Sequence, residues 1–556
     1  PMKSLLLGAC FLLTPFSLLA QMTTANNVTS PIVAATNSAL KNTALNASMS
    51  SSWLDAPISA NGGGCYVATH GKITPTPNLP DTLRHVKTCG GYAAPYANEQ
   101  WVKTTCQRTP AGYCINQSSA GSAYAFTSFA TGVTDAVNLW FTSIYNPGGS
   151  ERLAFIHEEN VGMSGFNLQP GAAWEGRTRI GLAYSADSGN TWKYLGRIAL
   201  PFNDPLPFNI QGTPYYIYNG DFYIWYKDRN GGGTEGYAVS KANVAAVMAA
   251  ARTGNIGSNV WKKKTPTSWS NNVADEPSFP APAAEGIVHS QAAHSADGNY
   301  YMITTVMAGN AWGTASSYVA LFTVDPVTLA WTKKMDIVNE PLSAFDPDDA
   351  GNGYQYASIV DPAGRANGEV GTSFYVYSGK FQDSNAPFKQ ALYQWQVNTA
   401  TPTAFYKQSR GFASGTQGQN QWNYAAVLSG AYLTWNTAGG YWWQPSDSFN
   451  RIYNGGMSTG SSDGFLLIWT APQSGTVTVR QTVRSAQPTP SCGDGVDIAF
   501  QQNSTVRLSG HVAWDDTLGL SSQQSLPVTA GDHFYFYGTK SGNNFCDNLF
   551  WDPSIS

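Results

Sequence analysis

Short runs in which polar and apolar residues alternate recur along most of the chain, and this period of two predicts β-strands. Residues 179–184 and 192–200 are two such runs. The stretch between them supplies Asp187, Gly189 and Asn190, residue types that a tight turn needs for side-chain hydrogen bonds or a positive φ. We therefore expect a β-hairpin here.

A longer pattern repeats around this hairpin. Residues 141–160, 215–228, 291–306 and 356–380 each read as a short strand, a turn rich in Asn, Asp or Gly, and an aromatic strand. A third strand-like run follows each of them, and a fourth begins near Trp192, Trp261 and Trp331 in the first three. Four-stranded units at a spacing of roughly 65 to 75 residues are typical of β-propeller blades. We expect five blades, with six as an open alternative. The fifth would come from the cysteine-rich region or from the residues after Pro402.

The pattern changes after about residue 403. Residues 403–443 are rich in Gly, Gln, Asn and aromatic side chains, and regular β alternation begins at Trp469. Only residues 241–252, which are rich in Ala, predict a helix. The expected fold is all-β: a β-propeller over residues 120–402, followed by a jelly-roll-like β-sandwich over residues 403–556.

The first part of the chain has a different composition. Residues 1–20 combine Lys3 with an apolar run that ends at Ala20, which is the pattern of a secretory signal peptide. A lipoprotein site at Cys10 is the alternative. Residues 21–52 are poor in large apolar side chains, and we expect a disordered leader. Residues 53–119 are rich in Cys, Gly and Pro and predict an irregular, disulfide-stapled segment.

Six cysteines remain after the predicted signal peptide, and an even number fits disulfides in an exported protein. We expect Cys492 to pair with Cys546. The other four would form two bridges whose connectivity stays open: Cys65, Cys89, Cys106 and Cys114. A four-cysteine zinc site is the alternative, although the chain lacks a C-x-x-C pair.

Composition narrows the range of partners. Charged residues make up 12% of the chain and aromatic residues 13%, with 55 glycines, and the formal net charge is −4. Such a surface offers no basic field for nucleic acid or for an anionic membrane, so we expect neither partner. We expect a secreted, extracellular or periplasmic, monomer.

In a propeller, polar side chains at the ends of the inner strands face a central funnel. His157, Glu158 and Glu159 end an otherwise apolar strand, where a charge is costly unless it is solvated or paired. We therefore take them as catalytic candidates, together with Asp135 and His289. A structural salt bridge is the alternative. Candidates for substrate binding are amide, basic and aromatic side chains at comparable positions, namely Gln211, Tyr226, Arg229, Gln291 and Tyr356.

The turn Ser185-Ala-Asp-Ser-Gly-Asn-Thr-Trp192 resembles the Asp-box of sialidases and related β-propeller proteins. In that family Asp and Thr tie the turn, and Trp wedges between neighbouring sheets. The box lies away from the substrate, so this resemblance concerns the fold. The sialidase arginine triad finds no recognisable equivalent in this sequence.

Residues 211–226 resemble a blade of the five-bladed propeller glycosidases that act on furanosides and pentosides. Those enzymes carry carboxylates on the inner strands of three successive blades. The resemblance implies that Asp135 is the base. Amides and histidines stand where the other acids belong, unless Glu158, Glu159 or the Asp275–Glu276 pair supplies them.

Three function classes follow. The preferred one is glycoside hydrolysis, with Asp135 as base or water-positioning carboxylate and Glu158 or Glu159 as proton donor. The second is a polysaccharide lyase that uses His or Tyr for β-elimination on a uronate. The third is a glycan-binding protein without catalysis. We expect no cofactor and no catalytic metal. Residues 346–352 are acidic enough for a structural calcium, but they lack the complete EF-hand pattern.

Overall fold

The structure is a computed structural model. It describes residues 28–36, 59–62, 65–70, 84–89, 99–108, 114–118, 125–130, 139–159, 178–203, 210, 214–280, 286–307, 317–340, 353–382, 389–399, 405–486 and 493–556, apart from positions 188, 190, 258, 364, 366, 413, 414, 515, 517, 518 and 546. The chain divides into two compact units. Unit 1 comprises Pro1–Val33, Val338–Pro347 and Thr401–Ser556, and unit 2 comprises Ala34–Ile337 and Asp348–Ala400.

Unit 2 is built from five β-sheets among its described residues. The first is β2 (Ser59–Gly62), β3 (Cys65–His70), β4 (Arg84–Cys89), β5 (Glu99–Arg108) and β6 (Cys114–Ser118). The second, in sheet order, is β7 (Ala125–Phe129), β11 (Thr191–Ala199), β10 (Thr178–Ser185), β9 (Arg152–Glu159) and β8 (Leu139–Tyr145). The third is β12 (Tyr215–Tyr218), β13 (Asp221–Arg229), β14 (Glu235–Asn243), β15 (Lys262–Lys264) and β16 (Trp269–Ser270).

The other two sheets follow in chain order. The fourth is β20 (Trp331–Glu340), β19 (Ser317–Val324), β18 (Tyr300–Met307), β17 (Gly286–Ser295) and β22 (Glu369–Val370). The fifth is β1 (Ile32–Thr36), β24 (Lys389–Asn398), β23 (Ser373–Gln382) and β21 (Gly353–Val360).

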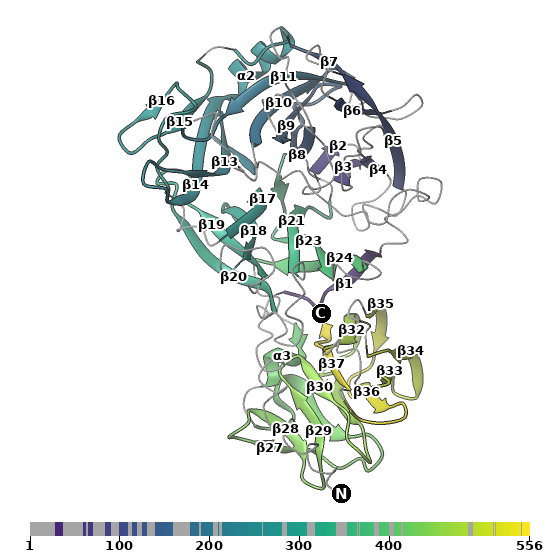
Figure 1. Cartoon of the computed structure of the whole chain (residues 1–556). Coiled ribbons are helices and arrows are strands. Elements are labelled where there is room, and N and C mark those ends of the chain that lie inside the picture. The colour runs from purple at the N-terminus through teal and green to yellow at the C-terminus, as the bar shows by residue number, and fades with distance from the viewer. Residues whose placement is uncertain are drawn as a thin grey trace, which may run out of the picture. The chain divides into compact units, whose positions relative to one another are not determined.

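Five strands, one from each sheet, form an inner ring (Figure 1). Strand β2 contacts β8 and β21, and β17 contacts β21 and β12. The ring closes between β12 and β8, where the Tyr215 hydroxyl donates to the Ile144 carbonyl at 2.9 Å. Each inner strand pairs antiparallel with the next strand of its sheet. This arrangement is a β-propeller, and the predicted all-β fold is confirmed.

The cysteine-rich region forms the first sheet, β2 to β6, whose first strand contacts β8 and β21 of the ring. This region is one of the two sources that the sequence left open for a fifth blade. Its strands lie in the stretch that the sequence predicts to be an irregular, disulfide-stapled segment. Within this sheet the register places Cys65 directly opposite Cys89.

The predicted hairpin is confirmed as β10 and β11. Asp187 ties its turn, since one carboxylate oxygen accepts the Thr191 amide at 2.8 Å and the other accepts the Thr191 hydroxyl at 2.6 Å. Gly189 adopts a φ of 79°, which a glycine permits at no steric cost. The Trp192 indole is buried and donates to the Gly189 carbonyl at 3.0 Å.

Helix α2 (Val244–Arg252) confirms the predicted helix with a later start, because β14 continues to Asn243. The Asn243 side chain caps it by accepting the Ala246 amide at 3.2 Å. Buried apolar side chains of α2 join the core between the second and third sheets. In the part of the chain that the structure describes, no helix is long and apolar enough to cross a membrane.

Unit 1 is a β-sandwich of two sheets. The larger runs β25 (Tyr406–Lys407), β38 (Ser554–Ile555), β32 (Gly475–Ser485), β37 (Asn548–Trp551), β30 (Gly456–Ser458), β29 (Asp447–Tyr453), β28 (Tyr441–Gln444) and β27 (Thr434–Asn436), with β35 (Leu520–Val528) paired to β32. The smaller runs β26 (Trp422–Ala426), β31 (Phe465–Thr470), β36 (His533–Lys540), β33 (Val496–Gln502) and β34 (Thr505–Val512). Two short helical turns, α3 (Gln408–Gly411) and η3 (Gln419–Gln421), precede β26. Alternate side chains of both sheets form one apolar core, as the period of two predicts.

The structure describes the predicted disordered leader, residues 21–52, only over residues 28–36, and this part is ordered. Val28, Thr29 and Ser30 are buried in unit 1. The Ser30 amide donates to the Ser554 hydroxyl at 3.0 Å, and Lys407 donates to the Val28 carbonyl at 3.0 Å. Low hydrophobicity misled the prediction here, because backbone hydrogen bonds hold this segment.

Candidate functional site

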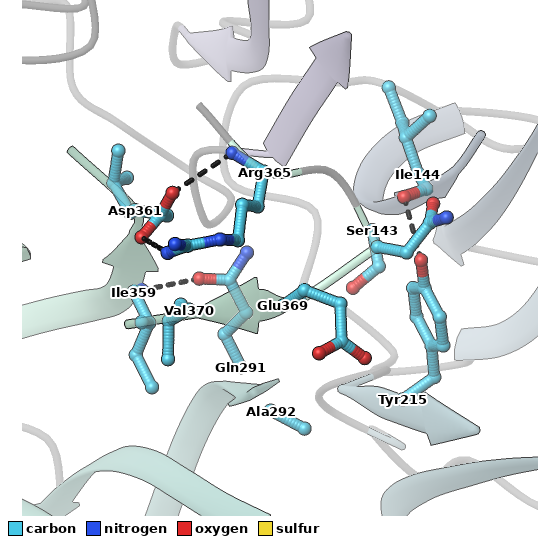
Figure 2. A pocket seen from close by; sticks show the side chains of 13 residues that line it. Ser143, Ile144, Tyr215, Gln291, Ala292, Ile359, Asp361, Arg365, Glu369 and Val370 are labelled. Atoms are coloured by element: carbon cyan, nitrogen blue, oxygen red, sulfur yellow. Dashed lines mark hydrogen bonds and ion pairs between the residues drawn. The ribbon is translucent and has the colours of Figure 1, made fainter. Parts of the chain in front are cut away.

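One cavity of unit 2 lies where the inner strands turn into their neighbours, and we call this the hairpin end of the ring (Figure 2). It encloses about 470 Å³, part of which is open to solvent. Four sheets and one loop line it, through Ser143, Ile144, Tyr215, Gln291, Ala292, Ile359, Val360, Asp361, Arg365, Asn367, Gly368, Glu369 and Val370. The lining residues of β8, β17 and β21 stand in the second half of each strand, so these three inner strands run toward the cavity. Tyr215 is the first residue of β12.

The loop between β21 and β23 closes this end. Buried Asp361 accepts the Arg365 guanidinium at 2.9 Å and the Gly371 amide at 3.1 Å (Figure 2). Asn367, whose φ is 63°, exchanges two hydrogen bonds with the backbone of Asn146, at 2.6 and 2.8 Å. The loop thus joins the fifth sheet to the second.

The remaining polar groups at the hairpin end also have partners. The Glu369 carboxylate lies 3.0 Å from His294 Nδ1, and the His294 ring stacks on Tyr300. Burial raises the pKa of Tyr215 well above its ordinary value, so the phenol stays protonated. Gln291, a predicted substrate ligand, accepts the Ile359 amide. This geometry fits a role in closing the ring.

The catalytic candidates lie at the other end, where the inner strands begin; we call it the opposite end. The register pairs Leu139, the first residue of β8, with Glu158 near the end of β9. Glu158 is fully buried. It accepts the Tyr194 hydroxyl at 2.6 Å and a bidentate pair of Arg197 hydrogen bonds at 2.9 and 3.0 Å. A carboxylate held in this way has no access to substrate. This is the salt bridge that the sequence offered as the alternative, and it removes Glu158 as proton donor.

Two further candidates at this end are buried. His157 is 2% exposed. Tyr226 is fully buried, and its hydroxyl lies 2.7 Å from the Ser240 hydroxyl. Burial raises the pKa of Tyr226 far above its ordinary value. Tyr226 is therefore a core residue, and the predicted role in substrate binding is wrong.

Beside Tyr226 lies a buried ion pair that the sequence did not predict. Asp228 and Lys263 are both fully buried, with 2.6 Å between the carboxylate and the ammonium. Burial raises the pKa of Asp228 and lowers that of Lys263, because each charge loses its hydration. Asp228 is the last residue but one of β13 and precedes Arg229, whose side chain is half-buried. Arg229 keeps its place as a candidate for binding.

The other predicted site residues are described in part or not at all. For Glu159, His289 and Tyr356 the structure describes the strand position and not the side chain. Glu159 ends β9, and His289 and Tyr356 stand in β17 and β21. Asp135 and Gln211 lie outside the described residues, as do Cys492, Cys546 and residues 346–352.

Asp275 and Glu276, the acids that the sequence offered as replacements, both accept hydrogen bonds from nearby groups. Asp275 accepts hydrogen bonds from Ser270 at 2.5 Å and from Asn272 at 2.6 Å. Glu276 accepts the Gly231 amide at 2.8 Å. Both hold turns at the edge of the third sheet. Among the residues that the structure describes, no group of three or more His, Cys, Asp or Glu side chains could hold a metal ion.

No protein-family model matches the sequence, and no curated protein matches it. Solved structures match by shape. An exo-β-1,3-galactanase from Phanerochaete chrysosporium bound to β-1,3-galactotriose has 11% identity and a TM-score of 0.37, covering 95% of this chain and 100% of its own. A β-fructofuranosidase of Bombyx mori has 8% identity and a TM-score of 0.33, covering 90% and 89%.

A sialidase of Trypanosoma rangeli in complex with sialic acid has 11% identity and a TM-score of 0.34, covering 90% of this chain and 80% of its own. Similarity at this level carries no argument about activity. The fold assignment rests on the sheets and their register.

Proposed function

We propose that this chain is a carbohydrate-active enzyme that hydrolyses glycosidic bonds at the opposite end of the propeller. One observation carries the proposal: the inner strands β8, β17 and β21 of three sheets run toward the same cavity. Their starting ends, and the ends of the strands that pair with them, therefore meet at one end of the ring. The polar candidates of separate sheets stand on these segments.

The proposed roles change with the geometry. Asp135 remains the proposed base or water-positioning carboxylate. Glu159 replaces Glu158 as the proposed proton donor, because it follows Glu158 directly and ends the same strand. Arg229 and His289 are proposed to bind hydroxyl groups of the substrate.

The proposed substrate is a polysaccharide or oligosaccharide. The low share of charged residues and the high share of aromatic ones suit sugar faces and hydroxyls better than a polyanion. We also propose that residues 1–20 direct export and that the protein acts as a secreted monomer. In that compartment Cys65 and Cys89 would form a disulfide, as their opposed positions favour.

The test is incubation of the purified full chain with a panel of glycans, with new reducing ends as the readout. Hydrolysis predicts new ends without the ultraviolet absorbance of an unsaturated uronate. Asp135→Asn and Glu159→Gln should each lower kcat by about 10²-fold or more. Asp325→Asn, in an exposed turn between β19 and β20, is the matched control and should keep full activity.

Three outcomes would contradict the proposal. Unsaturated products would favour a lyase. Binding without new ends would favour a glycan-binding protein. Full activity in both Asp135→Asn and Glu159→Gln would refute the assigned roles.

A further inference from the structure

Exposed apolar side chains of unit 1 gather on segments that connect its strands. Four of them are each more than half exposed: Leu428, Tyr432, Phe449 and Phe545. They stand in residues 427–432 between β26 and β27, residues 445–449 around the start of β29, and residues 541–545 after β36. Apolar side chains that form a contiguous exposed patch mark interaction sites, whereas single ones are ordinary.

Two buried aspartates bring these segments together around residues 459–464, which connect β30 to β31. Asp463 accepts the Leu428 amide at 2.7 Å, which ties the first segment to this connection. Asp447, the first residue of β29, accepts the Ser462 amide at 2.8 Å. The second segment is therefore tied to the same connection.

Residues 541–545 reach the same end of the sandwich. The Thr459 amide donates to the Asp547 carbonyl at 3.3 Å. The Lys540 ammonium, at the end of β36, donates to the Ser461 carbonyl at 2.5 Å. We call the following four segments the loop end of unit 1: residues 427–432, 445–449, 459–464 and 541–545.

Hydrogen bonds hold the backbone that carries the exposed side chains. Asp463 also accepts the Ser429 hydroxyl at 2.9 Å and the Gly464 amide at 2.8 Å. The Phe545 amide donates to the Asn543 side chain at 2.9 Å. Segments that are fixed before binding lose little conformational entropy when a ligand arrives.

The loop end exposes no charged side chain. Its exposed positions carry only Leu, Tyr, Phe, Pro, Ala, Gly, Ser and Asn. The acids within it, Asp447 and Asp463, are buried. Its half-buried neighbours Lys540 and Asp494 have opposite signs. The surface therefore combines apolar rings with hydroxyl and amide groups and is electrically neutral.

We propose that the loop end of unit 1 binds an uncharged polysaccharide. Aromatic rings offer flat apolar faces to the C–H faces of sugars, and serine and asparagine side chains hydrogen-bond to hydroxyl groups. The neutral surface matches a neutral partner, since an anionic membrane or a nucleic acid would call for exposed lysine or arginine. The choice of a polysaccharide rests on the proposed function, but binding here does not require the catalytic residues of unit 2.

The test is depletion of the full chain from solution by insoluble uncharged polysaccharides, namely cellulose, xylan, mannan and β-1,3-glucan. We expect saturable binding to at least one of them. Phe449→Ala and Phe545→Ala should each raise the dissociation constant about 3- to 10-fold, the loss expected for one aromatic contact. The triple variant, which adds Tyr432→Ala, should no longer bind measurably. All three side chains are exposed, so the Tm should stay that of the parent.

The control is Val506→Ala in β34, which removes an apolar group as exposed as Phe449, at 52%. Val506 lies beside the turn that follows β33, whereas the first residue of β33, Val496, pairs with Lys540. The control position is therefore at the other end of the sandwich. This variant should bind polysaccharide as the parent does.

Three results would overturn the inference. The first is no binding to any of the four polysaccharides, and the second is binding that the triple variant retains. The third is binding to vesicles of phosphatidylcholine and phosphatidylglycerol in place of polysaccharide.

These results are distinct from a failure of the proposed function. Binding that the triple variant loses, without new reducing ends from any glycan, would contradict hydrolysis and support this inference. Hydrolysis of soluble oligosaccharides, together with unchanged polysaccharide binding by the triple variant, would support hydrolysis and overturn this inference.

Discussion

At the scale of single residues, Glu158 shows what a strand pattern can and cannot reveal. Its position at the end of an apolar strand pointed correctly to a charge with a special environment. The partners, Tyr194 and Arg197, stand on β11, two strands away in the sheet. Alternation fixes the face of the strand on which a side chain lies, but not the side chains that reach it across a sheet.

One sequence signal pointed to this contact. Gly181 lies in a buried strand, where glycine often marks a close approach. A methyl group at this position would lie 2.2 Å from the Tyr194 hydroxyl. The glycine therefore makes room for the ring that donates to Glu158.

We predict that Glu158→Gln is a stability variant. The amide carries no charge to match that of Arg197, and breaking a buried ion pair costs about 3–5 kcal/mol. Urea unfolding measures this loss. The kcat of the folded fraction should match that of the parent. A variant that is as stable as the parent but inactive would return Glu158 to the catalytic site.

At the scale of elements, the sequence predicted the repeating units well because each is local. A strand, a turn or loop and the next strand follow one another in the sequence, and both the hydrophobic alternation and the turn residues predict them. The first sheet was ambiguous because its place in the ring depends on contacts of β2 with β8 and β21, which no local pattern encodes. The functional site was predicted least well, since burial is a property of neighbouring sheets.

Helix α2, which follows β14 of the third sheet, is hydrogen-bonded to the second sheet. Arg252, its last residue, donates two hydrogen bonds to Glu151, at 2.7 and 2.8 Å, and Tyr184 of β10 donates a third at 2.6 Å. The Arg252 and Tyr184 hydrogen bonds lower the pKa of Glu151 to about 2.

This contact predicts a dependence on acid. Because the folded-state pKa of Glu151 lies below its ordinary value near 4.5, the contact stabilises unit 2 fully above that pH. The contribution is lost as the pH falls toward 2. Arg252 is half exposed, so solvent screening keeps the contribution small.

The measurement is urea unfolding of the parent and of Glu151→Gln at several pH values. The difference in unfolding free energy between them should be present at pH 6 and shrink at pH 3. Tyr184→Phe, which removes one of the three hydrogen bonds, should show a smaller difference in unfolding free energy with the same pH dependence. A difference that does not change with pH would contradict the assignment.

At the scale of the whole molecule, segments far apart in sequence complete unit 1. Ser30 donates through its amide to Ser554 and through its hydroxyl to the Asp552 carbonyl. The Thr482 hydroxyl donates to the Pro31 carbonyl at 2.7 Å. A prediction from local composition could not find this, because the segment is polar and its partners are distant.

We predict that Ser30→Ala lowers the unfolding free energy of unit 1 by about 1–2 kcal/mol, since it leaves the buried Asp552 carbonyl without this donor. Chemical denaturation followed by tryptophan fluorescence measures the loss. Ser525→Ala, at an exposed serine of the same unit, is the control and should change stability by less than about 0.5 kcal/mol. Equal losses in the two variants would contradict a specific role for Ser30.

The burial of Ser30 also bears on how the molecule is made. Its partner Ser554 follows 524 residues later, so the ribosome synthesises the segment around Ser30 long before the segment that contacts it. The propeller sequence lies between them and has time to fold while the early segment waits. Completion of the sandwich is therefore a late step, and contacts between such distant segments form slowly.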